Sequence, residues 1–511
     1  MHIRPFHGEN IHEVLFMGVF QNLRKFFFTQ GKSSDQVTAK PEKNEKPALN
    51  HILDQFKDCI DFQQRTYPNC SVHIVYLPFL VGPEPLKRDI VDPLSEATEE
   101  EAEQIFKRSQ YKLTGDAKEC VKGILDGQAA IFFRDLTYLV DISEPVGRSI
   151  SQSETETVIS GPHDGFVENL SQNLGVLRKK IKSTHLKTVK FEVGEIAKTD
   201  VVLAYIDRIA DQDMVEDLKK RIRSIEFDAV MDSNMLIQLI DENPNSVFPQ
   251  FMTTERPDAI ASKLIGGRIV GFVDGSPSAF VCPTNFFDFF SSPDDYYQRW
   301  LLGSALRILR FIGFLITISF TAFYVSVTTY HYEMIPHTML LNLTESRAKV
   351  PFPPLIEALL METTIELLRE AGARLPTKVG QTIGIVGGIV IGQAAVQAGF
   401  TSNILIISVA TSAIASFTIP SYIMSASIRL IRFGLIIMAG VLGNLGLMMC
   451  IGLVVIHLSG VTNMGTSYLT PLSPMNFSDL LDTFVRGPFW GLRKRPSISD
   501  SQNKSTNKMR K

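Results

Sequence analysis

Hydrophobic residues are distributed very unevenly along this chain of 511 residues, and this feature constrains the fold more than any other. Residues 1–300 carry charges in nearly every block of ten, whereas most of 306–330 and 379–458 is apolar. The hydrocarbon core of a bilayer is about 30 Å thick and takes about 20 consecutive apolar residues to cross as a helix. The sequence therefore predicts an integral membrane protein with a soluble N-terminal half followed by an all-α polytopic membrane domain.

Four segments are expected to span the bilayer, with one further amphipathic or re-entrant helix before the second of them. The last of the four has only Asn444 and His457 as polar interruptions. The middle two are less hydrophobic but hold no charged side chain, and only three residues separate them, which is typical of a transmembrane hairpin. The four expected spans are Ile308–Val327, Thr382–Phe400, Ile404–Tyr422 and Phe433–Leu458.

The orientation of these spans follows from their number and from the basic residues around them. An even number of spans puts both termini on one side, and the basic tail indicates that this side is the cytoplasm. Arg307 and Arg310 are expected to reach the headgroup level from the start of the first span. Arg429 and Arg432 would then lie outside, so either the hairpin is partly re-entrant or the charge rule fails locally.

The first half of the chain is predicted to be α/β and to hold two similar subdomains. Buried strands are expected at Val72–Leu77 and Ala129–Phe133, with a helical stretch at Glu99–Arg108 between them. A similar order of elements recurs at Val201–Ile206 and Lys263–Phe272, which points to a duplicated unit. The expected divisions are a flexible arm and linker at 1–48, soluble subdomains at 49–155 and 156–295, a transmembrane domain at 296–460 and a basic cytoplasmic tail at 461–511.

Composition argues against several functional classes. The formal net charge is −3 and the soluble half has no basic stripe, so nucleic acid is not an expected partner. The five cysteines have no CxxC spacing and the histidines have no partner at metal-binding spacing, so neither a zinc site nor a disulfide framework is indicated. No Ser/His/Asp or Cys/His set can be nominated, and the sequence predicts no enzyme, no cofactor and no metal.

The segment Thr382–Phe400 is the main candidate for function, because its two helical faces differ in kind. One face is small and is expected to pack against another helix, and the other carries two amides that need polar partners in a bilayer. Either this polar face lines a pore with an apolar constriction, or its glutamines bond to neighbouring helices. The small face holds Gly384, Gly388, Gly392, Ala395 and Gly399, and the polar face holds Thr382, Val386, Ile389, Val390, Gln393 and Gln397.

A helix is predicted to begin at Pro354, which needs no N–H at that position. Its charged face, formed by Glu362, Glu366, Arg369 and Glu370, suggests that it lies along the membrane surface or dips into it. Glu357 falls in the middle of the apolar face. It is either a buried carboxylate in an ion path or coupling network, or a first-turn glutamate stabilised by the helix dipole.

The chain resembles the A subunit of the GerA-type spore germination nutrient receptors of Bacillus and related spore formers, over nearly everything from about residue 50 to 495. Many stretches agree in order, which is more specific than any single motif. The stretches are GPHDGFVENL at 161–170, FPQ at 248–250, TERPD at 254–258, DGSP at 274–277, DDYY at 294–297, PFPP at 351–354, LREAGARLP at 368–376 and IVGGIVIGQAAV at 385–396.

The resemblance implies a spore inner membrane location and partners that composition cannot show. Such A subunits work with a transporter-like B subunit and a lipoprotein C subunit, contact membrane lipids, and are thought to self-associate into a channel that releases monovalent cations. Nutrients are thought to bind the B subunit. The resemblance favours the segment Thr382–Phe400 as the wall of the conduit, and a non-conducting scaffold that transmits the signal remains the alternative.

Overall fold

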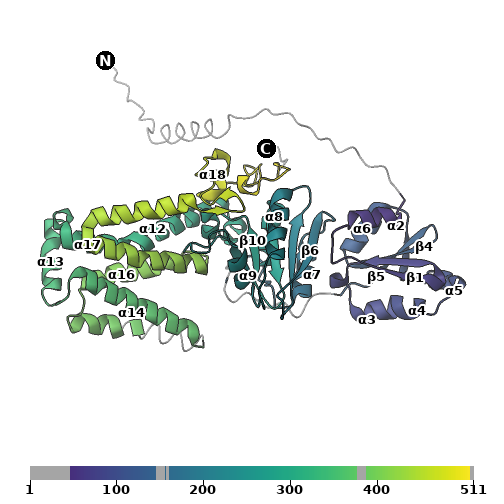
Figure 1. Cartoon of the computed structure of the whole chain (residues 1–511), viewed down its shortest axis with the longest axis horizontal. Helices are drawn as coiled ribbons and strands as arrows, with labels where there is room; N and C mark the ends of the chain where they lie inside the picture. The colour runs from purple at the N-terminus through teal and green to yellow at the C-terminus, as the bar shows by residue number, and fades with distance from the viewer. Residues whose placement is uncertain (1–45, 145–155, 157–159, 377–386, 389, 507–511) are drawn as a thin grey trace, which may run out of the picture. The chain divides into compact units, whose positions relative to one another are not determined.

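The computed structural model describes residues 46–144, 156, 160–376, 387–388 and 390–506 (Figure 1). The predictions for the N-terminal arm up to residue 45 lie outside the described residues. So do the predictions for Thr382, Gly384, Val386 and Ile389 on the candidate pore helix.

Two five-stranded antiparallel sheets form the soluble half, and both have the same topology. The first sheet has the order β1-β2-β4-β5-β3 and the second has the order β6-β7-β9-β10-β8, so each is connected as 1-2-4-5-3. The strands expected at Val72–Leu77, Ala129–Phe133 and Val201–Ile206 are confirmed as β2, β4 and β7. The strands are β1 Gln63–Tyr67, β2 Val72–Tyr76, β3 Tyr111–Thr114, β4 Gln128–Phe133, β5 Leu136–Asp141, β6 Leu186–Val193, β7 Thr199–Ile206, β8 Met252–Thr254, β9 Ile269–Val273 and β10 Ala279–Cys282.

Helices cover both faces of each sheet, because successive side chains of a buried strand point to opposite faces. In the first subdomain Ile74 packs in one cluster with residues of α5, while the adjacent Val75 packs in another with residues of α2 and α6. In the second, Leu203 packs with α8 and α9, and Val202 packs with α7 and α10. The helices are α2 Leu49–Gln55, α3 Pro83–Leu86, α4 Asp92–Leu94, α5 Glu99–Ile105, α6 Ala117–Leu125, α7 Leu170–Lys180, α8 Gln212–Arg223, α9 Ser233–Ile240 and α10 Pro257–Ile265.

A buried ion pair joins the two subdomains. Arg178 of α7 donates from Nε and Nη2 to the two carboxylate oxygens of Asp61, at 2.5 and 2.9 Å, and both side chains are almost fully buried. Thr188 of β6 donates to the same carboxylate at 2.7 Å. These contacts cross from one subdomain to the other.

The C-terminal half is helical, and its helices run back and forth beside one another (Figure 1). Among the described helices, α12 and α17 are long and apolar enough to cross a bilayer by length and composition. Short elements lead into and follow them. The elements are η4 Phe286–Phe290, α11 Asp294–Tyr297, α12 Trp300–Tyr330, η5 Tyr332–Met334, α13 His337–Arg347, α14 Pro354–Arg374, the helical residues 390–397, α16 Asn403–Ser416, α17 Tyr422–Gly460, β11 Thr462–Asn463, β12 Thr466–Ser467, α18 Phe477–Thr483 and η6 Ser497–Ser499.

The helix labelled α17 doubles back on itself at Gly443, whose φ of 63° and ψ of −143° interrupt the helix. Ser427 near its start donates to the carbonyl of Val247, and His457 near its end pairs with the neighbouring Ser246. A straight helix would separate residues 427 and 457 by about 45 Å. The prediction of one span over Phe433–Leu458 is therefore wrong, because this stretch contains the turn of a helical hairpin.

The span predicted over Ile404–Tyr422 is also shorter than expected. The helix α16 ends at Ser416, and the chain is non-helical from Phe417 through Ser421 before α17 begins. Proline lacks an N–H and disfavours helical backbone in the residue before it, which explains the break. The 14 residues of α16 reach about 21 Å, less than the thickness of a hydrocarbon core.

The C-terminal segment folds onto the second subdomain and differs from the solvated basic tail that composition suggested. The Tyr468 hydroxyl donates to the carbonyl of Pro249, and Arg495 donates to the carbonyl of Ile265. Ser499 is buried and donates to the carbonyl of Gly266. The soluble domain is thus built from residues at both ends of the described chain.

Candidate functional site in the helical domain

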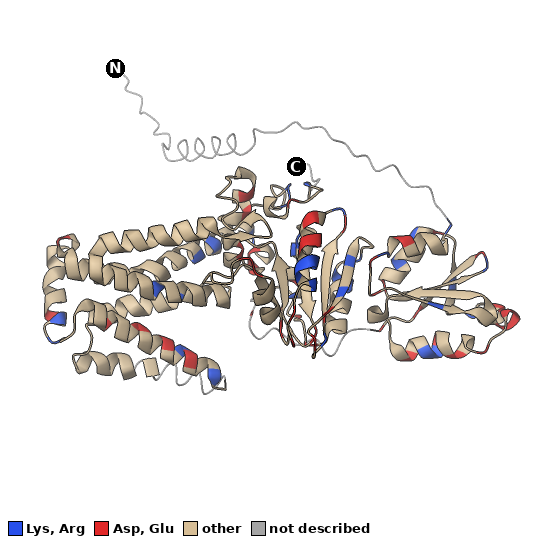
Figure 2. Ribbon diagram, in the orientation of Figure 1, with Lys and Arg blue, Asp and Glu red and all other residues tan. Residues whose placement is uncertain are grey.

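A network of buried charges lies between α14 and α17. Arg432 Nη2 lies 2.7 Å from Glu362 Oε2 and 3.1 Å from Glu366 Oε1, and Arg429 Nε lies 3.2 Å from Glu366 Oε2. Glu362 and Arg432 are fully buried, and Glu366 keeps 27% of its side chain exposed. Figure 2 shows the red and blue bands of α14 within a helical region that is otherwise mostly uncharged.

Two helical spacings produce this network. Glu362 and Glu366 are four residues apart on α14, so both carboxylates lie on one face of that helix. The two arginines of α17 are three residues apart and likewise face α14. Hydroxyl groups from two more helices complete it. Thr321 of α12 donates to Glu362 at 2.9 Å, and Arg432 Nη1 donates to Ser412 of α16 at 3.0 Å. Four helices therefore meet at one buried group of charges.

The network corrects two expectations. Glu362 was expected on an exposed face and is fully buried, and Arg429 and Arg432 are paired inside the bundle rather than placed in solvent outside the membrane. Their complementary spacing to Glu362 and Glu366 was the sequence signal that could have revealed the pairing. Ionisable groups inside a membrane domain are costly unless paired and commonly mark functional positions.

Glu357 lies in the first turn of α14 and is fully buried, so it combines features of both interpretations of this residue. Its Oε1 accepts from the Thr401 hydroxyl at 3.0 Å and from the backbone N–H of Ser402. Ser402 is the N-cap of α16, where a carboxylate interacts favourably with the positive end of the helix dipole. Glu357 therefore fixes the chain between the candidate pore helix and α16.

The described part of the candidate pore helix leaves its polar face exposed in a single chain. Val390 is 57% exposed, and Gln393 and Gln397 are also exposed. Ala395, from the small face, packs against the apolar cluster of the helical domain. A Cβ at Gly388 or Gly392 would meet nothing within 4 Å, so close helix packing at these two positions remains a prediction. At Gly399 the positive φ of 71° and the nearby Lys349 carbonyl do require glycine.

A second buried charge cluster lies where the soluble half joins α12. Asp295 Oδ2 accepts from Arg307 Nε at 3.1 Å and from Arg310 Nη1 at 2.8 Å, and Asp295 and Arg307 are fully buried. Arg307 also pairs with Asp482 of α18 at 3.2 Å, and the Tyr296 hydroxyl donates to the same carboxylate at 2.9 Å. The expectation that Arg307 and Arg310 extend to the headgroups is wrong, because Asp295 holds them within the protein.

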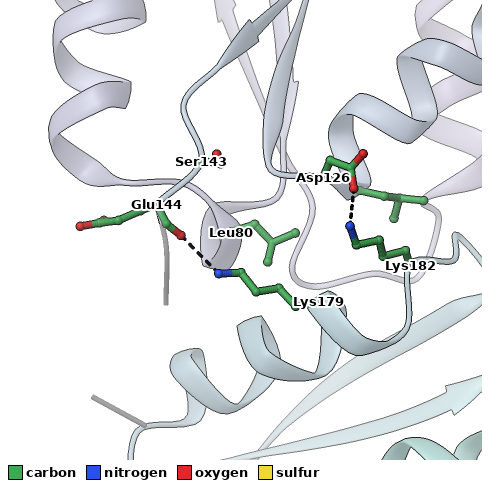
Figure 3. A pocket seen from close by; sticks show the side chains of 7 residues that line it. Leu80, Asp126, Ser143, Glu144, Lys179 and Lys182 are labelled. Atoms are coloured by element: carbon green, nitrogen blue, oxygen red, sulfur yellow. Dashed lines mark hydrogen bonds and ion pairs between the residues drawn. The ribbon is translucent and has the colours of Figure 1, made fainter. Parts of the chain in front are cut away.

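A cavity of about 340 Å³ lies between the two soluble subdomains (Figure 3). Part of its polar lining is paired, since Lys182 Nζ lies 2.6 Å from Asp126 Oδ1 and Lys179 donates to the backbone carbonyl of Glu144 at 3.4 Å. Ser143, at its rim, donates to Asp141 at 2.7 Å. The cavity therefore offers weaker indications of function than the helical domain does.

Comparisons with known proteins identify the family to which the chain is similar. The family model for the Bacillus/Clostridium GerA spore germination protein matches residues 49–498. The chain is 42% identical over 462 residues to spore germination protein GerQA of Bacillus cereus, covering 89% of this chain and 92% of that protein. It is 36% identical over 441 residues to spore germination protein KA of Bacillus subtilis strain 168, covering 84% and 81%.

Among solved structures, the chain is similar to the N-terminal domain of the A subunit of the Bacillus megaterium spore germinant receptor GerK3. The identity is 23% and the TM-score is 0.35, over 48% of this chain and 99% of that domain.

Proposed function

This chain belongs to the GerA family of spore germination proteins, and from that premise we propose that it is the membrane subunit of a nutrient-germination receptor that assembles with further copies of itself into a gated cation channel. Nutrient binding by partner subunits would open the channel and start germination. The proposed partners are a B-type transporter-like subunit and a C-type lipoprotein, in the inner membrane of the spore, with the soluble half and the C-terminal segment in the cytoplasm.

The observation that carries the channel proposal is the exposed polar face of the helix at 390–397. Gln393 and Gln397 are exposed in a single chain, although Ala395 between them packs into the apolar cluster of the helical domain. An amide without a polar partner is costly in hydrocarbon, so these side chains need either water or another protein chain. An oligomer in which this face surrounds an aqueous path supplies both. Val390 would then form part of an apolar constriction that excludes water when closed.

The alternative is a scaffold that transmits a signal without conducting ions. The cluster of Asp295, Arg307 and Asp482 favours it, because these contacts link α12 to the soluble half and to α18. In that case the glutamines would face a partner subunit instead of an ion path. Both proposals predict a role in germination, and they differ in what happens to ion flux without nutrient.

The deciding experiment is ion flux in the absence of nutrient, from spores or from liposomes holding the reconstituted receptor. Val390→Ala shortens the side chain, which makes the proposed constriction wider and less apolar, so we expect a raised basal flux. Gln393→Leu removes a polar group from the path and should lower the nutrient-triggered flux. Val455→Ala is the matched control, since Val455 on α17 has a similar exposure of 54%. If neither Val390→Ala nor Gln393→Leu changes flux while the receptor still assembles, the scaffold replaces the channel.

A further inference from the structure

Arg486 is a buried arginine whose principal hydrogen-bonding edge is unused. The residue is 2% exposed, and its Nε and Nη2 have no hydrogen-bond partner among the described residues. Burial lowers the pKa of Arg486. A guanidinium remains charged in a protein, so an unpaired buried edge is costly and points to a missing anionic partner.

Other arginines of this protein use the same edge of the guanidinium to bind carboxylates. Nε and Nη2 together form the fork that binds both oxygens of an anion side-on. Arg178 uses this fork on Asp61, Arg256 uses it on Asp258, and Arg88 uses it on Asp89, with distances from 2.5 to 3.0 Å. No carboxylate among the described residues accepts a hydrogen bond from the fork of Arg486.

The surrounding cluster has an excess of positive charge. Arg307, Arg310 and Arg486 lie with Asp295 and Asp482, so three cations face two anions. Arg307 Nη2 is also buried without a hydrogen-bond partner among residues that the structure describes. The guanidinium groups of Arg307 and Arg486 lie 5.6 and 5.7 Å from the ring centre of Tyr296. One added negative charge would balance the cluster.

The position of the cluster indicates where this anion comes from. It lies at the start of α12, which is long and apolar enough to cross a bilayer. Around it are large exposed side chains, including Trp300, Leu301 and Phe489, at 44%, 68% and 57% exposure. Aromatic side chains at the end of a membrane helix are typical of the headgroup level, where lipid phosphates lie. The Phe489 ring lies 4.2 Å from the Arg486 guanidinium and would have to turn aside to admit a phosphate.

We propose that the Nε–Nη2 fork of Arg486 binds the phosphate of an anionic phospholipid headgroup at the point where α12 enters the membrane. The phosphate accepts two parallel hydrogen bonds from the fork, and the positive excess of the cluster favours a lipid with a net negative charge. The lipid would thereby join the C-terminal segment to the first membrane helix. This assignment does not depend on whether the protein conducts ions.

The test uses the full chain, purified in detergent and supplied with phosphatidylglycerol, phosphatidylcholine or inorganic phosphate. The readouts are bound lipid by native mass spectrometry and the thermal unfolding midpoint. We expect wild type to retain phosphatidylglycerol and to be stabilised by it more than by phosphatidylcholine. Arg486→Lys keeps the charge but lacks the fork, and Arg486→Gln lacks both. The affinity of each variant for phosphatidylglycerol should therefore be roughly tenfold to a hundredfold weaker than that of wild type. Arg493→Gln removes an exposed arginine nearby and is the control.

Three results would overturn the proposal. The first is that Arg486→Lys, which tests the fork even if Arg486→Gln does not fold, binds phosphatidylglycerol as tightly as wild type. The second is that Arg493→Gln loses the lipid to the same degree, which would mean a nonspecific charge effect. The third is that inorganic phosphate stabilises wild type as strongly as the lipid, which would assign the fork to a free phosphate ion.

Discussion

Replacing Glu362 by glutamine tests the buried charge network directly. The substitution keeps the size of the side chain but removes the charge that lies 2.7 Å from Arg432. Breaking a buried ion pair by neutralising one partner typically costs about 3–5 kcal/mol, because the other charge is left buried. Arg432 retains Glu366 at 3.1 Å and Ser412 at 3.0 Å. We therefore expect a loss near the lower end, about 3 kcal/mol in the free energy of unfolding.

The assay is reversible unfolding in detergent micelles, followed by circular dichroism of the helical signal. Glu370→Gln is the control, because Glu370 pairs with Arg374 on the same helix but the two side chains are 59% and 78% exposed. Its loss should stay below about 0.5 kcal/mol. The double substitution Glu362→Gln with Arg432→Gln should cost less than the two single losses added together. A Glu362→Gln protein as stable as the Glu370→Gln control would refute the network as a stabilising element.

Three further predictions concern other parts of the chain. Burial would raise the pKa of Asp288, but Arg268 and Lys263 lower it overall; its contribution to stability should be present above about pH 4 and lost as pH falls further, and Asp288→Asn should flatten that part of an acid unfolding curve. Burial raises the pKa of Glu156 to about 7, so the folded state should lose stability as pH rises from about 4.3 to 7. In denaturant titrations, Glu156→Gln should therefore be more stable than wild type at pH 8 by up to about 3 kcal/mol and equally stable at pH 4. Gly443→Ala should destabilise the hairpin by about 1–3 kcal/mol, because the positive φ at this position is strained for alanine and the added Cβ would lie 3.1 Å from atoms of His331 and Tyr330. An unchanged thermal unfolding midpoint would contradict the turn at that residue.

Several strands of the soluble half, and the helix that begins at Glu99, could be predicted because their sequence signal is local. A run such as Val72–Tyr76 is buried on both faces of its sheet at every position except His73, and the other four residues are apolar or aromatic. The similarity of Val201–Ile206 to Val72–Leu77 also indicated, from the sequence, that the two subdomains share a topology. Each of these features is decided by residues close together in the sequence.

The helical domain was harder to predict because its decisive contacts join residues far apart in the chain. Gly443 lies in an apolar run that is long enough to be taken for one span, and the turn is shown by its backbone angles and by contacts of Ser427 and His457 with adjacent residues. Arg432 and Glu362 are separated by 70 residues in numbering, so neither position alone reveals the pair. Arg307 lies at the expected headgroup level, yet Asp295 and Asp482 take it inside the protein. Charge patterns predict the position of a basic side chain near a membrane only when no buried carboxylate competes for it.

The folding of the C-terminal segment onto the second subdomain has a consequence for how the protein is made. Asn463 donates to the backbone carbonyl of Gln250, and Gln502 donates its N–H to the carbonyl of Ile209. A ribosome completes residues up to 295 long before it reaches residue 463. The last contacts of the soluble domain therefore form only after the helices from α12 to α17 have been synthesised. Folding of this domain can finish only when the helical domain has been made.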